Sequence, residues 1–270
     1  MKLKEQLHCF PRLSKLAYHF LHERIAYNQR KANKDMLIQW HSLKNSAKSN
    51  RCFIVGTGPS LKIEDLEALQ DEVVFAPNRI FELFEHTAWR PTYYINQDHV
   101  LIQNFSDKIK EIPAELLFLP MDFRSVFTAE NYRFFVLRHR EFYPKDAPFS
   151  RNLSRYLAQG FTVIYGAIQI AAYMGFKEIY LLGVDHNYNI SRDANGNIKR
   201  NDNVAVNYAK GMTDFTLNGN LPRIEETTLA FETAEKLSKK LGIKIYNCTR
   251  GGKLEAFERK SLNDVLADNN

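Results

Sequence analysis

The sequence lacks the features that would place it across a membrane, outside the cell or around a metal ion. No apolar run reaches the roughly 18 residues of a membrane-spanning helix. The three cysteines, Cys9, Cys52 and Cys248, are too few and too widely spaced for a disulfide framework or a zinc site. A signal-peptide pattern is also missing. We therefore predict a cytoplasmic protein with no bound metal.

Negative charge is scarce in the first fifth of the chain. Ten Lys and Arg residues precede Asn50 against three acidic residues, a local charge of +7, whereas the whole chain carries +6. The remainder is close to neutral and has no basic patch interleaved with aromatic residues, which argues against nucleic-acid binding. The basic head predicts a local acidic partner, and an anionic membrane surface is the first candidate.

Residues 1–49 follow a helical pattern with one apolar stripe. The stripe contains Leu13, Leu16, Ala17, Phe20, Leu21 and Ile25, and after a polar break Met36, Leu37, Trp40 and Leu43. Two interpretations fit it. The segment is either an amphipathic helix on a membrane surface or an extension that packs on the body of the protein or on another subunit. We favour the packed extension.

From Arg51 onward, strand-like apolar runs alternate with helical segments. The runs lie at 52–55, 73–76, 92–96, 116–119, 133–137, 178–183 and 243–247. The clearest helices are at 162–174 and 224–241, the second closed by Gly242. This alternation predicts a Rossmann-like, doubly wound α/β domain with a mostly parallel sheet. Ligands of such sheets bind beyond the carboxyl ends of the strands.

The first run ends in a glycine-rich turn, Gly56-Thr57-Gly58-Pro59-Ser60. A strand, a glycine turn and a helix form the phosphate-binding loop of many nucleotide-binding domains. Gly56 and Gly58 would let backbone N–H groups approach an anionic oxygen, and Ser60 offers a hydroxyl as a helix cap or phosphate donor. The third glycine of the dinucleotide motif and the Walker lysine are missing, so a plain turn is the alternative.

Polar side chains follow three further strands. Asn78 and Arg79 come after the run at 73–76, and Asn96-Gln97-Asp98 after the run at 92–96. Amide and guanidinium groups at these places suit a ribose, a base or a phosphate. Arg250, in the Arg-Gly-Gly-Lys turn after the last run, suits an anion contact. Surface turns and helix caps are the alternative in each case.

Asp185 and His186 follow the run at 178–183. Asp185 could orient His186 as a general base or hold a metal with another carboxylate, whereas a capped turn is the plain alternative. The polar stretch from about 189 to 220 has no sustained period. More than about 15 such residues in a compact domain indicate a lid, a binding loop or disorder. Its place after His186 favours an active-site lid.

Two of these segments resemble one known superfamily. Residues 54–61, Ile-Val-Gly-Thr-Gly-Pro-Ser-Leu, resemble the opening G-[NT]-G-P-S-L of bacterial family-42 sialyltransferases and of the related MptE-like (pterin-pyrophosphokinase-like) proteins. Residues 174–185 resemble the L-G-[YF]-K-E-I-Y-L-x-G-[IV]-D of the same sialyltransferases. Asn78 and the strand at 243–246 match further positions, while residues 247–255 look more like the MptE-like group. The resemblance covers about residues 51–258.

The resemblance implies a site for a CMP-sugar that needs no metal. The implied nucleotide contacts are Gly56, Thr57, Gly58, Ser60, Asn78 and Thr162. We add Asn96, Gln97, Asp98 and Arg250 as substrate-binding residues. Tyr188, next to the position of the family's leaving-group tyrosine, would help the phosphate to leave. The family's catalytic His is absent, because no His follows His186, so Asp185 and His186 are our predicted catalytic pair.

We therefore predict a GT-A-variant-like glycosyltransferase of bacterial capsule or lipopolysaccharide synthesis. It would transfer a sialic-acid-like sugar from a CMP-sugar to a glycan acceptor, without a cofactor, at the inner membrane face. Two alternatives stay open: an ATP pyrophosphokinase with Mg²⁺ on Asp98 and Asp185, and a non-catalytic glycan-assembly protein. The predicted parts are a basic extension (1–50), a catalytic domain (51–258) with its lid, and a tail (259–270). Self-association is expected from the resemblance.

Overall fold

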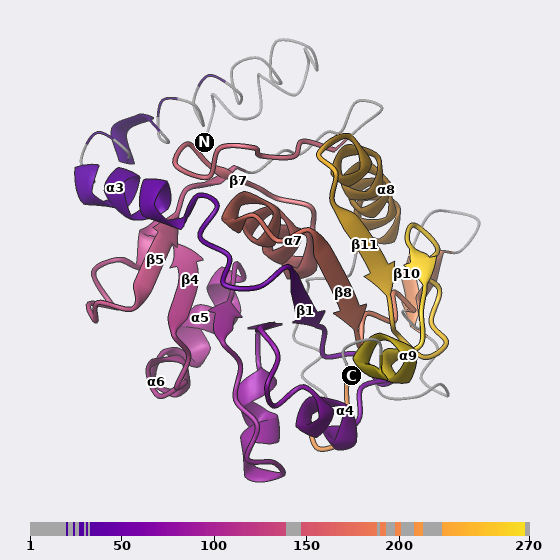
Figure 1. Ribbon diagram of the computed structural model, residues 1–270. Helices are drawn as coiled ribbons and strands as arrows, with labels where there is room; N and C mark the ends of the chain where they lie inside the picture. The colour runs from indigo at the N-terminus through magenta and orange to yellow at the C-terminus, as the bar shows by residue number, and fades with distance from the viewer. Residues whose placement is uncertain are drawn as a thin grey trace.

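An eight-stranded sheet forms the centre of the protein (Figure 1). The structure, a computed structural model, describes residues 20, 24, 27–29, 31, 33–138, 147–187, 190–192, 198–200, 208–212 and 223–267. The strands are β1 (Arg51–Val55), β2 (Val74–Pro77), β3 (Tyr93–Ile95), β4 (Leu116–Pro120), β5 (Tyr132–Phe135), β8 (Glu178–Leu182), β11 (Lys244–Asn247) and β12 (Glu258–Arg259). Their order is β12-β11-β8-β1-β2-β3-β4-β5, and every neighbouring pair is parallel. The predicted Rossmann-like α/β fold is confirmed.

Apolar side chains on both faces of the central strands explain this sheet. After its first residue, β1 is buried throughout, as are β2 and the later residues of β8. Parallel strands covered by helices on both faces have this composition. Across β1, β8 and β11 the register aligns Phe53, Tyr180 and Tyr246, whose rings stack with centroids 5.2 Å apart in each step. The stack fixes the register of the strands that end at the candidate site.

The chain first adds strands on one side of β1 and then on the other. From β1 it passes outward to β5 through α4 (Ile63–Ala68), the 3-10 helix η1 (Ile80–Glu85), α5 (His99–Asn104), α6 (Ser106–Lys110) and η2 (Met121–Phe123). It then returns through α7 (Val163–Met174), which lies over β1, β2 and β3, to β8 on the other side of β1. The helix α8 (Ile224–Lys240) follows and lies beside β11 and α7. The carboxyl ends of the neighbouring strands β1 and β8 form the topological switch point, where open α/β sheets bind ligands.

The described part of the N-terminal extension packs on the body. The helix α3 (Lys34–Leu43) buries Met36, Trp40 and Leu43, and Trp40 is fully buried. The Trp40 Nε1–H donates a hydrogen bond to the Phe134 carbonyl at 2.7 Å, and the Tyr173 hydroxyl donates to the Trp40 carbonyl at 2.9 Å. The favoured interpretation of the extension is confirmed for α3. Most of the stripe before it lies outside the described residues.

Two segments have more structure than the sequence indicated. Within the stretch assigned to a lid, β9 (Ile190–Arg192) pairs with β10 (Ile198–Arg200) as an antiparallel hairpin. Of the expected tail, residues 262–267 form α9 (Leu262–Ala267), with Leu262 and Val265 buried. The Arg51 guanidinium donates to the Val265 carbonyl at 2.9 Å, so α9 is tied to the start of β1. A small parallel sheet of β6 (Leu137–Arg138) and β7 (Leu157–Ala158) completes the described strands.

Candidate functional site

The glycine loop after β1 lies directly against the end of β8. The Gly56 N–H donates to the Leu182 carbonyl at 2.6 Å, and the Gly58 N–H donates to the Gly183 carbonyl at 2.9 Å. A Cβ on Gly56 would overlap the Gly183 carbonyl, and one on Gly58 would overlap the Asp185 carboxylate. Both N–H groups were expected to face an anionic oxygen. Here they hold the loop on β8, so close packing of two backbones is what requires the glycines.

The Asp185 carboxylate is part of the same contact. The Ser60 hydroxyl donates to Asp185 Oδ2 at 2.8 Å. The Asp185 carbonyl accepts from the Lys253 N–H at 2.7 Å, which ties the loop after β11 to the end of β8. From the sequence we expected Asp185 to orient His186 or to hold a metal, and Ser60 to act as a helix cap or phosphate donor. The structure instead pairs these two side chains with each other.

Arg250, predicted to bind substrate, holds the start of α4. Its guanidinium makes two hydrogen bonds to Asp65, one of them 2.7 Å long, and a third to the Ser60 carbonyl at 3.2 Å. Asp65 is 3 % exposed and also accepts from the Lys62 N–H at 2.9 Å. We call this group of residues in close contact the closed cluster. Its members are Gly56, Gly58, Ser60, Asp65, Gly183, Asp185 and Arg250.

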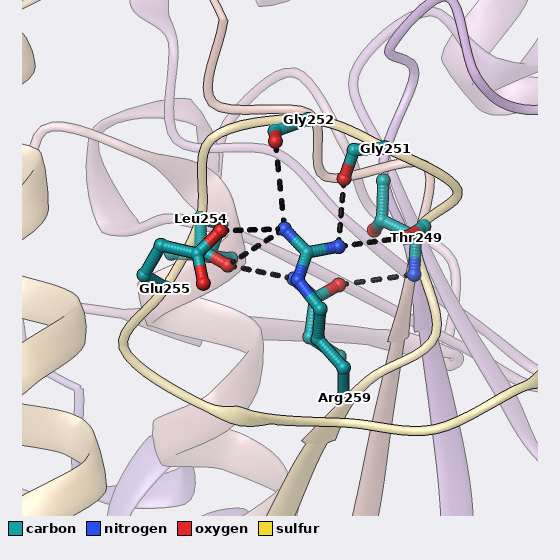
Figure 2. A network of polar contacts seen from close by, with 7 residues as sticks. Thr249, Gly251, Gly252, Leu254, Glu255 and Arg259 are labelled. Atoms are coloured by element: carbon teal, nitrogen blue, oxygen red, sulfur yellow. Dashed lines mark hydrogen bonds and ion pairs between the residues drawn. The ribbon is translucent and has the colours of Figure 1, made fainter.

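A second arginine shapes the Arg-Gly-Gly-Lys turn. Figure 2 shows the guanidinium of Arg259, on β12, surrounded by carbonyl oxygens of the turn. It donates to the carbonyls of Thr249, Gly251, Gly252 and Leu254 and to the Glu255 carboxylate, over 2.7 to 3.4 Å. The turn thus directs its carbonyl groups at a cation. Arg250, whose charge led us to predict an anion contact at this turn, is not the residue that organises it.

The ends of β2 and β3 differ from the closed cluster. Asn78 Oδ1 and Gln97 Oε1 are both buried, and neither has a hydrogen-bond partner among the described residues. Asn78 is left-handed, with φ at +52°, and its N–H donates to the Ile95 carbonyl at 3.2 Å. Gln97 Oε1 lies beside Gly166 in the second turn of α7. A buried acceptor without a donor is costly. We call these two oxygens the acceptor pair.

The neighbours of the acceptor pair serve the protein itself. The Asn96 side chain donates to the Tyr94 hydroxyl at 3.0 Å and accepts from the Asp98 N–H at 2.9 Å. Burial raises the pKa of Tyr94, whose protonated hydroxyl donates to the Asn78 carbonyl at 2.7 Å. Asp98 is the N-cap of α5 and accepts from Val100 and Leu101. Asn96 and Asp98 therefore fix the backbone that carries Asn78 and Gln97.

Thr162 stands at the start of α7. Its hydroxyl accepts from the Ile164 N–H at 3.3 Å, so it is the N-cap of a 12-residue helix. Helices that return from the carboxyl ends of parallel strands begin at that edge, and the closeness of Gly166 to Gln97 agrees with this. The positive end of the α7 dipole thus lies at the same edge as the acceptor pair.

His186 adopts an unusual conformation and holds its proton at a defined nitrogen. Its φ is +48°, uncommon outside glycine. Its Nε2 lies 2.7 Å from the Thr228 hydroxyl, which donates its single proton to the Ile224 carbonyl at 2.9 Å. The hydroxyl must therefore accept from Nε2–H, which leaves Nδ1 as the proton-free nitrogen. Burial lowers the pKa of His186, so the ring is neutral at pH 7. Tyr188, the third predicted catalytic residue, lies outside the described residues.

The sequence of residues 24–191, more than half of the chain, matches the family described as 6-hydroxymethylpterin diphosphokinase MptE-like. The chain belongs to the MptE-like family. Comparison of this MptE-like protein with curated proteins finds no significant match. In the described part, no helix is long and apolar enough to cross a membrane. Within the same residues, no three His, Cys, Asp or Glu side chains are grouped as metal ligands.

The MptE-like chain is similar to two solved glycosyltransferases. MAf glycosyltransferase from Magnetospirillum magneticum AMB-1 is 19 % identical with a TM-score of 0.48, over 85 % of this chain and 38 % of that one. The sialyltransferase CstII from Campylobacter jejuni, solved with CMP-3FNeuAc, is 15 % identical with a TM-score of 0.46, over 80 % of this chain and 87 % of that one. A CstII structure with cytidine-5'-monophosphate is 14 % identical with a TM-score of 0.41, over 78 % of this chain and 84 % of that one.

The roles of several residues of this MptE-like protein were not predicted from the sequence. Thr228 and Arg259 act through atoms that fold together from distant elements, and neither belongs to a motif. Arg79 was expected to pair with phosphate, but it is 2 % exposed and donates to Glu82 at 2.8 Å. A charged residue directly after a buried strand was the available signal. It does not say whether the charge serves a ligand or the protein.

Proposed function

We propose that this protein is a glycosyltransferase that takes a sialic-acid-like sugar from a CMP-sugar and transfers it to a glycan acceptor of a bacterial surface polysaccharide. The observation that carries the proposal is the acceptor pair at the carboxyl ends of β2 and β3. A nucleoside brings hydrogen-bond donors, the ribose hydroxyls and the base amino group, which would satisfy Asn78 Oδ1 and Gln97 Oε1. Cytosine has such an amino group, and CMP is the nucleotide that the sialyltransferase-like motifs imply.

The phosphate of the donor would lie at the start of α7. The helix dipole and the N–H groups of its first turn favour an anion there. Gly56 and Gly58 keep the role of nucleotide-binding residues in this proposal because their tight contact with β8 shapes the floor of the site. In this proposal the hydroxyl groups of Thr57 and Thr162 would also contact the phosphate. Negative charge on the departing phosphate would be stabilised by these donors.

His186 is the proposed general base. Transfer to an acceptor hydroxyl requires removal of its proton, and a neutral imidazole can accept it. Thr228 holds the Nε2–H tautomer, so Nδ1 would take the proton. The lowered pKa keeps the ring neutral at physiological pH. Asp185 would act through Ser60 and the loop, and Tyr188 would assist the departing phosphate.

The family description favours a second candidate, an ATP pyrophosphokinase. This reaction would use Mg²⁺, with Asp98 and Asp185 as the proposed ligands. Carboxylate oxygens are the donors that Mg²⁺ prefers, but one oxygen of each group already has a partner. Asp98 Oδ1 accepts from two N–H groups of α5, and Asp185 Oδ2 accepts from Ser60. Each carboxylate would therefore have its other oxygen for the metal.

The partners follow from the proposed reaction and from the extension. The donor is a nucleotide sugar, the acceptor a glycan, and self-association is expected. Contact with the inner membrane face would belong to the basic residues before Lys34, because α3 turns Met36, Trp40 and Leu43 to the body. Binding of the purified protein to vesicles with and without anionic lipid measures this contact.

A nucleotide screen separates the two candidate functions. Isothermal titration with CMP, CDP, UDP and ATP, each with and without Mg²⁺, is expected to show metal-independent binding of CMP. Tight ATP binding that requires Mg²⁺ would establish the pyrophosphokinase instead. Asn45→Gly and Asn78→Gly form the matched pair of variants, since both asparagines have positive φ and Asn45 lies far from the acceptor pair in the chain. Equal CMP affinity of the two variants would contradict the proposed site.

A further inference from the structure

We propose that residues 208–212, which we call the strap, hold the glycine loop in its nucleotide-binding orientation, with Arg79 and Tyr208 as positioning residues. This inference rests on the proposed nucleotide site. The strap lies within the polar stretch that follows His186 in the sequence, and its residues are Tyr208-Ala209-Lys210-Gly211-Met212. Neither Arg79 nor Tyr208 needs to touch the nucleotide for this role.

The peptide group between Thr57 and Gly58 is held from two sides. Its carbonyl oxygen, on Thr57, accepts from the Ala209 N–H at 3.0 Å. Its N–H, on Gly58, donates to the Gly183 carbonyl at 2.9 Å. The C=O and N–H of a trans peptide point in opposite directions. The strap therefore holds one side of this peptide and the end of β8 holds the other, so the peptide has one orientation while both contacts last.

The strap is itself fixed to the body. Ala209 is 1 % exposed, and the Met212 N–H donates to the Ala209 carbonyl at 3.0 Å to close a turn. Gly211 has φ at +97°, and a Cβ there would come within 3.0 Å of the His86 ring. The strap thus fits tightly on the end of η1. These contacts depend on small residues and a turn, which explains why no apolar period marks the segment.

Arg79 clamps the first residue of the strap. Its guanidinium carbon lies 4.7 Å from the centroid of the Tyr208 ring, and its Nη1 donates to Glu82 at 2.8 Å. A buried guanidinium over an aromatic face is a favourable contact. Arg79 directly follows Asn78, which carries one oxygen of the acceptor pair. The strap therefore connects the glycine loop, which would form the floor of the nucleotide site, to the end of β2, which would bind the nucleoside.

The test removes the clamp and measures both the loop and the nucleotide. Tyr208→Ala deletes the ring, Tyr208→Phe keeps it, and Tyr156→Ala is the matched control. Arg138 lies over the Tyr156 ring at the same 4.7 Å, but that stack belongs to β6 and the segment before β7. Hydrogen exchange of the unligated protein reports on the amides of Gly58 and Ala209. Isothermal titration with CMP gives the affinity of each variant.

Tyr208→Ala is expected to speed exchange at Gly58 and Ala209 and to weaken CMP binding about tenfold, the equivalent of one partly buried cation–π contact. Tyr208→Phe is expected to restore both values, and Tyr156→Ala to change neither. Unchanged exchange at Gly58 in Tyr208→Ala would overturn the inference, and so would faster exchange with wild-type affinity. If the wild-type protein binds no CMP, the proposed function fails, while the exchange data still decide whether the strap holds the loop.

Discussion

The closed cluster and the acceptor pair, on the two sides of β1, treat their polar groups in opposite ways. On the β8 side, the polar groups of the closed cluster are paired within the protein: Ser60 with Asp185, Arg250 with Asp65, and two glycine N–H groups with the carbonyls of Leu182 and Gly183. On the β2 and β3 side, the acceptor pair is buried without donors in the described part of the chain. The comparison teaches that the motif residues mostly pair within the protein, while the ends of the adjacent strands carry two buried oxygens without a partner.

Gly58→Ala attacks the closed cluster most directly and should have the largest effect. The new Cβ would lie 2.7 Å from the Gly183 carbonyl and overlap the Asp185 carboxylate, and both belong to the packed end of β8. We expect a loss of about 3 kcal/mol in the free energy of unfolding, measured with urea. Gly242→Ala is the control, with positive φ but no atom within 4 Å, and should cost about 1 kcal/mol. Equal losses would show that the contact with β8 is not what demands glycine.

Arg250→Met breaks the closed cluster at its ion pair. Asp65 would then carry a charge at 3 % exposure without its guanidinium partner. We expect a loss of about 2 kcal/mol in unfolding free energy, less than for a fully buried pair because the Arg250 side chain is 47 % exposed. The control is Arg124→Met, which removes an ion pair with Asp35 that is exposed on both sides. It should cost under about 1 kcal/mol. A substrate-binding Arg250 would instead leave stability unchanged and weaken binding.

Asn78→Gly tests the acceptor pair. Glycine accepts the positive φ of this position without strain, so the variant removes the carboxamide with little change in stability. Loss of one ligand hydrogen bond is expected to weaken CMP binding about tenfold by isothermal titration. Ser60→Ala, in the closed cluster, should show the reverse pattern, with lower stability and a smaller change in affinity. If Asn78→Gly lowers stability instead, the two sides of β1 do not differ as described.

The smallest expected effects come from two histidines with opposite pH dependence. Burial lowers the pKa of His186, so the unfolded chain takes up that proton first. The stability that neutral His186 contributes to the fold is therefore complete above about pH 6.5 and is lost as the pH falls below it. The hydrogen bond that His99 donates to the Asp122 carboxylate raises the pKa of His99. The stability that this bond contributes is present below about pH 6.5 and is lost as the pH rises through the folded-state pKa.

Urea unfolding at about pH 5.5 and about pH 8 measures both contributions. Replacement of His186 by Gln should reduce the loss of stability at the acid value. His99→Gln should lower stability at the acid value, by under about 1 kcal/mol because the His99–Asp122 pair is partly exposed. The same sign for both variants would contradict the environments assigned to the two rings.

The strands could be predicted closely because their signal is local. The runs at 52–55, 116–119 and 178–183 agree with β1, β4 and β8 to within a residue, since apolar side chains in short runs must be buried on both faces of a parallel sheet. Gly242 was expected to close α8 and has the positive φ of that role. The helix α9 was missed, because its two buried residues, Leu262 and Val265, are too few to form a period.

The candidate site was predictable in place but not in detail. The rule that ligands bind at the carboxyl ends of strands led to Asn78, Gln97, Asp185 and Arg250 alike. It did not separate them, because a polar residue after a strand looks the same whether its partner is a ligand or another part of the protein. Asp65 and Arg250 are 185 residues apart, and no local pattern connects them. His186 and its partner Thr228 are likewise 42 residues apart, so no local pattern connects them either.

The sequence by itself determined how strands and helices alternate along the chain, the glycine loop and the basic extension, since each depends on side chains that are neighbours in the sequence. Only the tertiary structure decided which polar groups are paired within the protein. That outcome depends on which atoms meet when β1, β8 and β11 align, and on Asn78 and Gln97 finding no donor among the described residues. Hydrogen bonds are satisfied over the whole fold, so the atoms left over can be identified only after the fold is known.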